Sequence, residues 1–303
     1  MANYSAADVP DQTGRVIVIT GANTGIGFEA ARVLASRGGR VLLGCRSEPK
    51  ANEAMDRIRA LHPAAQVEWL ALDLASLASV RSAAEQLQQE PFLDLLINNA
   101  GVMVPPRSLT EDGFELQFGV NHLGHFALTG LLLDKLARRP GARIVNVSSL
   151  AHVGGRIDFD DINAEKGYLR QSRYQMSKLA NMLFTLELQR RLAASGAACL
   201  AVACHPGIAD TELARYMSPW IMVLVPLLRP FFNTPAEGAL PTLQAATDQG
   251  VRGGDYYGPT QRGETARSSG KARIAIGGRD AKAAARLWAL SESLTGVTMA
   301  PGA

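Results

Sequence analysis

Continuous apolar runs alternate with segments of helical periodicity between residues 16 and 204 of the chain. The first run, VIVIT at 16–20, is β-branched throughout, which is typical of a strand buried on both faces of a parallel sheet. Further strands are predicted at 40–45, 67–72, 93–98, 142–147 and 198–204. Helices are predicted at 28–37, 51–61, 77–88, 114–138, 174–194 and 282–294, with an exposed loop at 261–280. This alternation predicts an α/β fold, a doubly wound parallel β-sheet with helices on both faces.

Composition narrows the class of protein further. The 303 residues are 47% hydrophobic, which is enough for one large core, and no low-complexity linker divides them, so a single domain over 1–303 is expected. The net charge is only +3 and no basic run is dense, which argues against a nucleic-acid partner. Three cysteines without CxxC spacing indicate reduced thiols, and residues 1–14 lack the apolar core of a signal peptide. We therefore expect a cytoplasmic protein.

The stretch TGANTGIG, at 20–27, lies between the first predicted strand and the first predicted helix. Gly21 suits a sharp turn, Gly25 allows a pyrophosphate to approach the backbone, and Gly27 lets the helix pack close to the sheet. Free N–H groups and the positive end of the helix dipole would favour the phosphates. In this position the stretch predicts a dinucleotide site in a Rossmann fold rather than a turn alone, with Asn23, Thr24 and Ile26 beside the glycines.

The T-G-x-x-x-G-x-G spacing and the motifs that follow it resemble the short-chain dehydrogenase/reductase family. The motifs span residues 15 to about 211 and are Asp73, Asn98-Asn99-Ala100-Gly101, Asn121, Ser148-Ser149, Tyr174-x-x-x-Lys178 and His205-Pro206-Gly207. The sequences NHLGHF, SKLAN and DYYGP, with the long gap between Ser149 and Tyr174, resemble the retinol-dehydrogenase-like branch of that family. The resemblance implies a single-domain Rossmann fold and an oxidoreductase that interconverts an alcohol and a carbonyl.

Tyr174 and Lys178 are four residues apart, so they share one face of a helix. A tyrosine alone is a poor base, because its reference pKa is about 10. A neighbouring ammonium favours the phenolate and lowers that pKa, so Tyr174 is predicted to act as the general acid/base during hydride transfer.

Two further catalytic residues come from the resemblance. Successive strand residues point to opposite faces, so only one of Ser148 and Ser149 should reach the pocket. The resemblance implies that it is Ser149, whose hydroxyl would hydrogen-bond the reacting oxygen. Asn121 is expected to position a water that links Lys178 to solvent. His122, His125 and His205 are interpreted as structural, and no metal site is expected because no third ligand accompanies the histidine pair.

The cofactor prediction is NADP(H) in preference to NAD(H). The second predicted strand ends Gly44-Cys45-Arg46, without the carboxylate that binds the ribose hydroxyls of NAD, and a guanidinium can bind the 2′-phosphate. By resemblance, Asp73 and Leu74 should contact the adenine, and Asn99, Ala100 and Gly101 its ribose. Tyr174 and Lys178 are expected to contact the cofactor as well. After the strand predicted at 198–204, the expected contacts to the nicotinamide side are Pro206, Gly207, Ile208 and Thr211.

The apolar segment at 217–232 suggests the class of substrate. Residues 14–211 are predicted to form the cofactor-binding and catalytic core, and 212–250 to cover an apolar alcohol or carbonyl substrate. The segment is too short to span a bilayer, so membrane contact is possible but not favoured. The resemblance implies a homo-oligomer through helices 114–138 and 174–194, and the alternative is that the apolar stripe of 174–194 belongs to the core. The alternative function is a catalytically silent nucleotide-binding sensor or scaffold.

Overall fold

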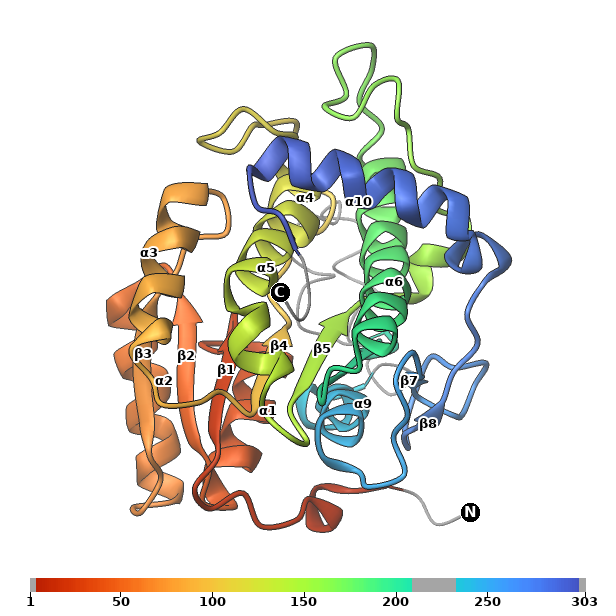
Figure 1. Ribbon diagram of the computed structural model, residues 1–303. Coiled ribbons are helices and arrows are strands. Elements are labelled where there is room, and N and C mark those ends of the chain that lie inside the picture. The colour runs from red at the N-terminus through yellow and green to blue at the C-terminus, as the bar shows by residue number, and fades with distance from the viewer. Residues whose placement is uncertain (1–3, 209–232, 300–303) are drawn as a thin grey trace.

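The computed structural model describes residues 4–208 and 233–299. Its centre is an eight-stranded sheet in the order β3-β2-β1-β4-β5-β6-β7-β8 (Figure 1). All neighbouring strands are parallel except β7 and β8, which pair antiparallel. The strands are β1 (Val16–Thr20), β2 (Arg40–Cys45), β3 (Val67–Ala71), β4 (Leu95–Asn98), β5 (Arg143–Val147), β6 (Leu200–Cys204), β7 (Tyr256–Gly258) and β8 (Gly270–Lys271). The predicted doubly wound parallel sheet is confirmed.

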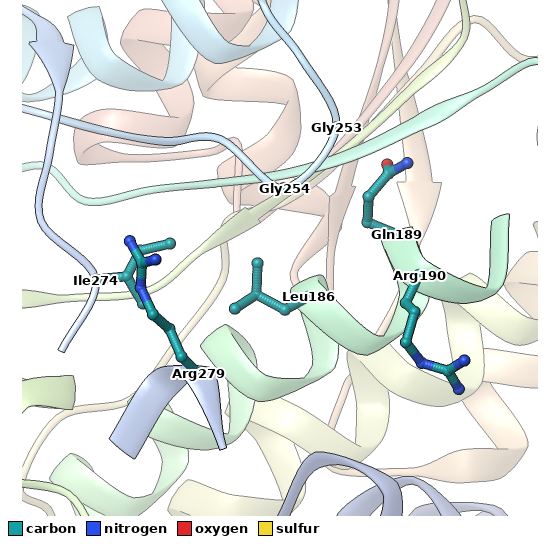
Figure 2. Close-up of a pocket in the computed structure, with 7 residues that line it drawn as sticks. All are labelled: Leu186, Gln189, Arg190, Gly253, Gly254, Ile274 and Arg279. Carbon is teal, nitrogen blue, oxygen red and sulfur yellow. The ribbon is translucent and has the colours of Figure 1, made fainter. Parts of the chain in front are cut away.

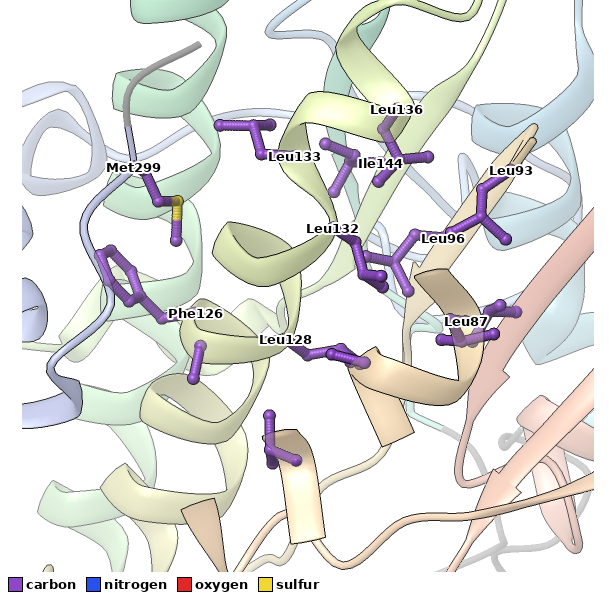
Figure 3. Packing of buried hydrophobic residues seen from close by; sticks show 14 of the residues in the cluster. Leu87, Leu93, Leu96, Phe126, Leu128, Leu132, Leu133, Leu136, Ile144 and Met299 are labelled. Atoms are coloured by element: carbon purple, nitrogen blue, oxygen red, sulfur yellow. The ribbon is translucent and has the colours of Figure 1, made fainter. Parts of the chain in front are cut away.

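Helices cover both faces of this sheet because its strands are apolar on both sides. Ile17 and Ile19 of β1 face a cluster formed with α1 (Gly25–Ser36), α2 (Glu48–Leu61) and α9 (Pro235–Thr247). Val16 and Val18 face the opposite cluster, formed with α3 (Leu77–Gln88), α5 (Gly124–Ala137) and α6 (Arg170–Ser195). Figure 3 shows part of this second cluster, where α5 leucines meet Leu96 of β4 and Ile144 of β5.

Several helices begin earlier than the sequence predicts. α1 begins at Gly25, inside the glycine-rich stretch, and α2 begins at Glu48, with a proline in its first turn. Proline suits that position because its missing N–H and fixed φ cost nothing there. α6 likewise begins at Arg170 rather than at 174.

The helix predicted at 114–138 is observed over residues 116–137, but it is not α-helical throughout. It comprises a short α4 (Leu116–Phe118), the π-helical turn η2 (Gly119–Leu123) and then α5. A π-helical turn adds a residue to the helical ring, and such turns are frequent at functional sites. Asn121 lies in this turn, so the helix is irregular at a predicted catalytic residue.

The C-terminal third differs from the sequence prediction in two places. Residues 235–247, inside the expected substrate-covering segment 212–250, form α9, whose Ala239, Leu243 and Ala246 are buried against the sheet. This part therefore belongs to the core, while residues 209–232 lie outside the described ranges. The segment expected to be an exposed loop at 261–280 is not loop throughout, because it contributes β8 and the short helix η6 (Ile276–Arg279). It is also only partly exposed, since Ala266 and Ser269 are buried.

The last helix, α10 (Ala281–Thr295), crosses α5 and α6 (Figure 1). Its Trp288 is almost fully buried, with its ring centroid 5.4 Å from that of Phe126 and 5.9 Å from that of Phe184. These two phenylalanines belong to α5 and α6, the helices expected to form an interface between subunits. Here α10 of the same chain covers this apolar surface, and the homo-oligomer stays a prediction.

Two short helices complete the described structure, η1 (Ala6–Asp8) near the N-terminus and η3 (Leu150–Gly154) after β5. None of the helices in residues 4–208 and 233–299 combines the length and the hydropathy needed to cross a membrane.

Candidate active site

The predicted site residues follow the carboxyl ends of adjacent strands. Gly21 follows β1, Asn99 follows β4, Ser148 follows β5 and His205 follows β6. Because these strands are parallel, their carboxyl ends share one edge of the sheet, where open α/β sheets bind ligands. The topology therefore gathers motifs that are far apart in sequence.

The glycine-rich loop has the backbone that a bound pyrophosphate requires. Gly21 and Gly25 have positive φ angles of 67° and 58°. A Cβ on Gly27 would lie 2.5 Å from the Gly21 carbonyl oxygen, a distance that side chains do not tolerate. Asn23 and Ile26 are half-buried and Thr24 is exposed at the N-cap of α1. A bare loop that opens onto the N-terminus of a twelve-residue helix fits the phosphates of a dinucleotide.

The loop after β4 is fixed directly beside the glycine loop. The Asn99 side chain donates from Nδ2 to the Thr20 carbonyl oxygen at 2.8 Å, and a Cβ on Gly21 would touch Ala100 at 3.0 Å. The other end of this loop approaches the catalytic residues, since a Cβ on Gly101 would lie 3.5 Å from Lys178 Nζ. Asn99, Ala100 and Gly101 thus connect the predicted cofactor side of the site to its predicted catalytic side.

Residues predicted to hold the adenosine end lie after β2 and β3. Arg46 is exposed immediately after β2, and no carboxylate occupies that strand end. Asp73 is half-buried after β3, and its Oδ1 accepts a hydrogen bond from the Ala75 N–H at 2.9 Å. Leu74 is buried and packs against Gly124 of α5. β2 and β3 are neighbours in the sheet, so these residues lie on the same side of the glycine loop.

Tyr174 and Lys178 lie on one face of α6, as their spacing predicts. Lys178 is 4% exposed, and its Nζ donates to the Val147 carbonyl oxygen at 3.1 Å. The same Nζ is 5.8 Å from the centroid of the half-buried Tyr174 ring. A buried ammonium is therefore held next to the phenol by the end of β5.

The two serines after β5 have different surroundings. Ser148 is 1% exposed, and its hydroxyl donates to the Lys178 carbonyl oxygen at 2.8 Å, inside the protein. Ser149 is half-buried, and its Oγ accepts a hydrogen bond from the Ala151 N–H at 3.1 Å. The Ser149 hydroxyl keeps its own proton for another acceptor, as the predicted role requires.

Asn121 is held by its side chain in the π-helical turn. Its Oδ1 accepts from the Val102 N–H at 2.8 Å, and its Nδ2 donates to the Val102 carbonyl oxygen at 3.0 Å and to Ser177 Oγ at 2.9 Å. Ser177 Oγ donates in turn to the Tyr174 carbonyl oxygen at 2.8 Å.

The sequence motifs do not identify Thr20 or Ser177 as residues of this site. Thr20 could have been noticed, because it is the one polar residue of β1.

The histidines of this region are buried and uncharged. Burial lowers the pKa of His122 to about 3 and that of His125 to about 4. His122 shares a hydrogen bond with Ser291 Oγ at 2.8 Å and packs among aromatic rings. Within the described ranges, no group of three or more His, Cys, Asp or Glu side chains is placed to hold a metal ion.

The turn after β6 is fixed by a distant loop. Pro206 and Ile208 are half-buried, and the Ile208 N–H donates to the Thr265 carbonyl oxygen at 2.9 Å. Gly207 has a positive φ of 73°. A Cβ at Gly207 would collide with that same Thr265 carbonyl. Thr211, the last predicted cofactor contact, lies outside the described residues.

A separate pocket of about 390 Å³ lies elsewhere on the molecule (Figure 2). Its lining begins on α6 at Leu186, twelve residues beyond Tyr174, which is about 18 Å along a helix. Gly253 and Gly254 line its other side. It shares no residue with the predicted site, so we do not connect it with the chemistry there.

Comparisons with known proteins identify relatives over nearly the whole chain. The family model described as short chain dehydrogenase matches residues 15–221. Human retinol dehydrogenase 12 is 46% identical over 287 residues, covering 94% of this chain and 87% of the relative. Human retinol dehydrogenase 13 is 43% identical over 302 residues, covering 97% and 87%.

Solved structures with a similar fold also match most of the chain. The crystal structure of an uncharacterized protein from Mycobacterium paratuberculosis is 43% identical, with a TM-score of 0.83, and covers 99% of this chain and 100% of that one. A blue fluorescent protein from a metagenomic library, crystallised in complex with NADPH, is 26% identical, with a TM-score of 0.63 over 81% and 96% of the two chains.

Proposed function

Because the chain belongs to the short-chain dehydrogenase family and is an oxidoreductase acting on CH–OH groups with NAD(P), we propose a more specific reaction. In this proposal the protein is an NADP(H)-dependent enzyme that interconverts an alcohol and a carbonyl on a small to medium apolar substrate. Tyr174 is its general acid/base. The retinol dehydrogenases named above support this substrate class, because retinol is an apolar alcohol.

One observation carries the proposed mechanism: the buried Lys178 ammonium lies 5.8 Å from the centroid of the Tyr174 ring and donates to the carbonyl oxygen of Val147, two residues before the half-buried Ser149. The ammonium favours ionisation of the phenol, so Tyr174 can take the proton of an alcohol or return it to a carbonyl oxygen. The Ser149 hydroxyl donates a hydrogen bond to the same oxygen and stabilises its developing negative charge. The nicotinamide, when bound, supplies or accepts the hydride.

Loss of nicotinamide absorbance tests this proposal directly. Purified protein would be incubated with NADPH and a panel of apolar aldehydes and ketones, with retinal included. We expect turnover of at least one apolar carbonyl compound. Tight NADPH binding with no turnover on any member would instead support the catalytically silent sensor.

Replacing Arg46 by Ala should weaken NADPH binding and leave NADH binding unchanged. The exposed guanidinium after β2 is the cation nearest in sequence to the position where the 2′-phosphate is expected. A charge-assisted hydrogen bond contributes about 1.5–3 kcal/mol, which corresponds to a roughly 10- to 150-fold higher NADPH Kd in the variant. Titration of intrinsic fluorescence with each cofactor measures the two Kd values.

Lys282→Ala is the matched control for Arg46→Ala, because it removes another exposed cation, on α10. It should leave both Kd values unchanged. An unchanged NADPH/NADH ratio in Arg46→Ala would refute the proposed role of this residue and the preference derived from it.

A further inference from the structure

His125 lies in the first turn of α5, between the end of β1 and the π-helical turn that holds Asn121. It is 2% exposed and both of its ring nitrogens have partners. Nε2 is 2.8 Å from Thr20 Oγ1, and Nδ1 is 3.0 Å from the Asn121 carbonyl oxygen. One side chain therefore touches both the cofactor half and the catalytic half of the site.

The direction of both hydrogen bonds follows from their chemistry. The Asn121 carbonyl oxygen can only accept, so His125 Nδ1 carries the proton and donates it. Burial lowers the pKa of His125 to about 4, so the ring is neutral near pH 7 and Nε2 has no proton. Nε2 must then accept the hydroxyl proton of Thr20.

This direction fixes the Thr20 hydroxyl as well. With its proton directed to His125, the oxygen accepts from the Asn99 N–H and the Ala100 N–H, each at 2.9 Å. The Ile97 carbonyl oxygen is the competing acceptor, but at 3.5 Å it is much farther from the hydroxyl than His125 is. His125 thereby holds the Thr20 oxygen lone pairs toward the loop that begins at Asn99.

The second ring nitrogen reaches the catalytic residues. His125 donates to the main-chain oxygen of Asn121, and the side chain of Asn121 hydrogen-bonds Val102 and Ser177. Ser177 continues the chain of hydrogen bonds to the carbonyl oxygen of Tyr174. A rotation of the His125 ring would therefore disturb the π-helical turn at Asn121.

We propose that His125 is a positioning residue, which fixes the nucleotide-binding loop through Nε2 and the Asn121 turn through Nδ1. It touches neither cofactor nor substrate itself. This inference rests on the proposed function, because the effect on the nucleotide-binding loop is measured as cofactor affinity and the effect on the Asn121 turn as turnover.

Two conservative variants separate the two hydrogen bonds. A glutamine amide oxygen lies near the place of Nε2, so His125→Gln keeps an acceptor for Thr20 and loses the Asn121 contact. An asparagine amide nitrogen lies near the place of Nδ1, so His125→Asn does the reverse. Since one hydrogen bond is worth about 0.5–1.5 kcal/mol, each loss should change the corresponding constant by up to about tenfold.

The expected results are opposite for the two variants. His125→Gln should bind NADPH with a Kd within about twofold of the wild type and show a kcat lower by up to about tenfold. His125→Asn should show an NADPH Kd higher by up to about tenfold and a nearly unchanged kcat at saturating NADPH. His122→Gln and His122→Asn are the matched controls, because His122 is buried in the adjacent π-helical turn but bonds Ser291 of α10. They should lower the melting temperature without changing NADPH Kd or kcat.

A measurement on the wild-type protein guards against variants that do not fold. Nitrogen-15 NMR of the five histidine rings should show His125 as the neutral Nδ1–H tautomer at pH 7. The Nε2–H tautomer, or equal effects of the Gln and Asn variants on both constants, would overturn the inference. A wild-type enzyme without any turnover would instead contradict the proposed function, and the NADPH Kd values and the tautomer would still test His125.

Discussion

Tyr174→Phe should reduce turnover by about 10²- to 10⁴-fold while raising the NADPH Kd by no more than about tenfold, because the variant loses only the phenolic oxygen and with it at most one hydrogen bond to the cofactor. The ring of Tyr174 is half-buried and 5.8 Å from Lys178 Nζ, so phenylalanine can occupy the same place. Without the hydroxyl, no group in that position can give a proton to the carbonyl oxygen. Single-turnover absorbance with NADPH and an apolar aldehyde measures the rate, and fluorescence titration measures the Kd.

Tyr257→Phe provides the matched control for this experiment. Tyr257 is a buried tyrosine of β7 whose hydroxyl donates to Asp255 Oδ2 at 3.2 Å, in the cluster that faces α1 and α9. The loss of this hydroxyl should leave kcat within about twofold, since the hydrogen bond supports stability rather than catalysis. A Tyr174→Phe enzyme with more than a tenth of the wild-type rate would contradict the assignment of the general acid/base.

Most of the sheet, and the edge at which the motifs come together, could be predicted because they depend on local patterns. A run such as VIVIT has few stable alternatives to a strand buried on both faces, and the strand end then determines where Gly21 lies. Parallel strands bring their carboxyl ends together whatever the loops do, so the motifs after β1, β4, β5 and β6 meet.

The unpredicted features depend on partners that are distant in sequence. The π-helical turn at Asn121 is stabilised by Val102 and Ser177, and no periodicity in residues 114–138 indicates it. Thr20 and His125 are 105 residues apart, so a β-strand threonine and a helical histidine give no sign of their hydrogen bond. The sequence identifies His125 only as a structural residue, and its two hydrogen bonds show which parts of the fold it joins.

The last helix illustrates the same distinction. Its predicted bounds, 282–294, differ by one residue at each end from Ala281–Thr295. The apolar positions Leu287 and Trp288 predict a buried helix face, but they do not reveal the surface against which it packs. That surface comprises α5 and α6, so a homo-oligomer that used the same surface would first have to displace α10.

Trp288→Ala should therefore lower the free energy of unfolding by about 3–5 kcal/mol, the usual cost of removing a large buried aromatic side chain. Trp288 contacts Phe126 of α5 and Phe184 of α6, and the Arg191 guanidinium lies 4.2 Å from its ring centroid. Removing the indole leaves a cavity between three helices and also ends that cation–π contact. Urea unfolding, followed by circular dichroism, measures the loss.

Lys282→Ala, an exposed change on the same helix, should alter the free energy of unfolding by no more than about 0.5 kcal/mol. Light scattering on both variants then connects stability with assembly. If α10 covers the surface that α5 and α6 would otherwise offer to a second subunit, Trp288→Ala should associate more than Lys282→Ala at equal concentration. A loss of less than about 1 kcal/mol in Trp288→Ala would mean that α10 contributes little to holding this surface closed.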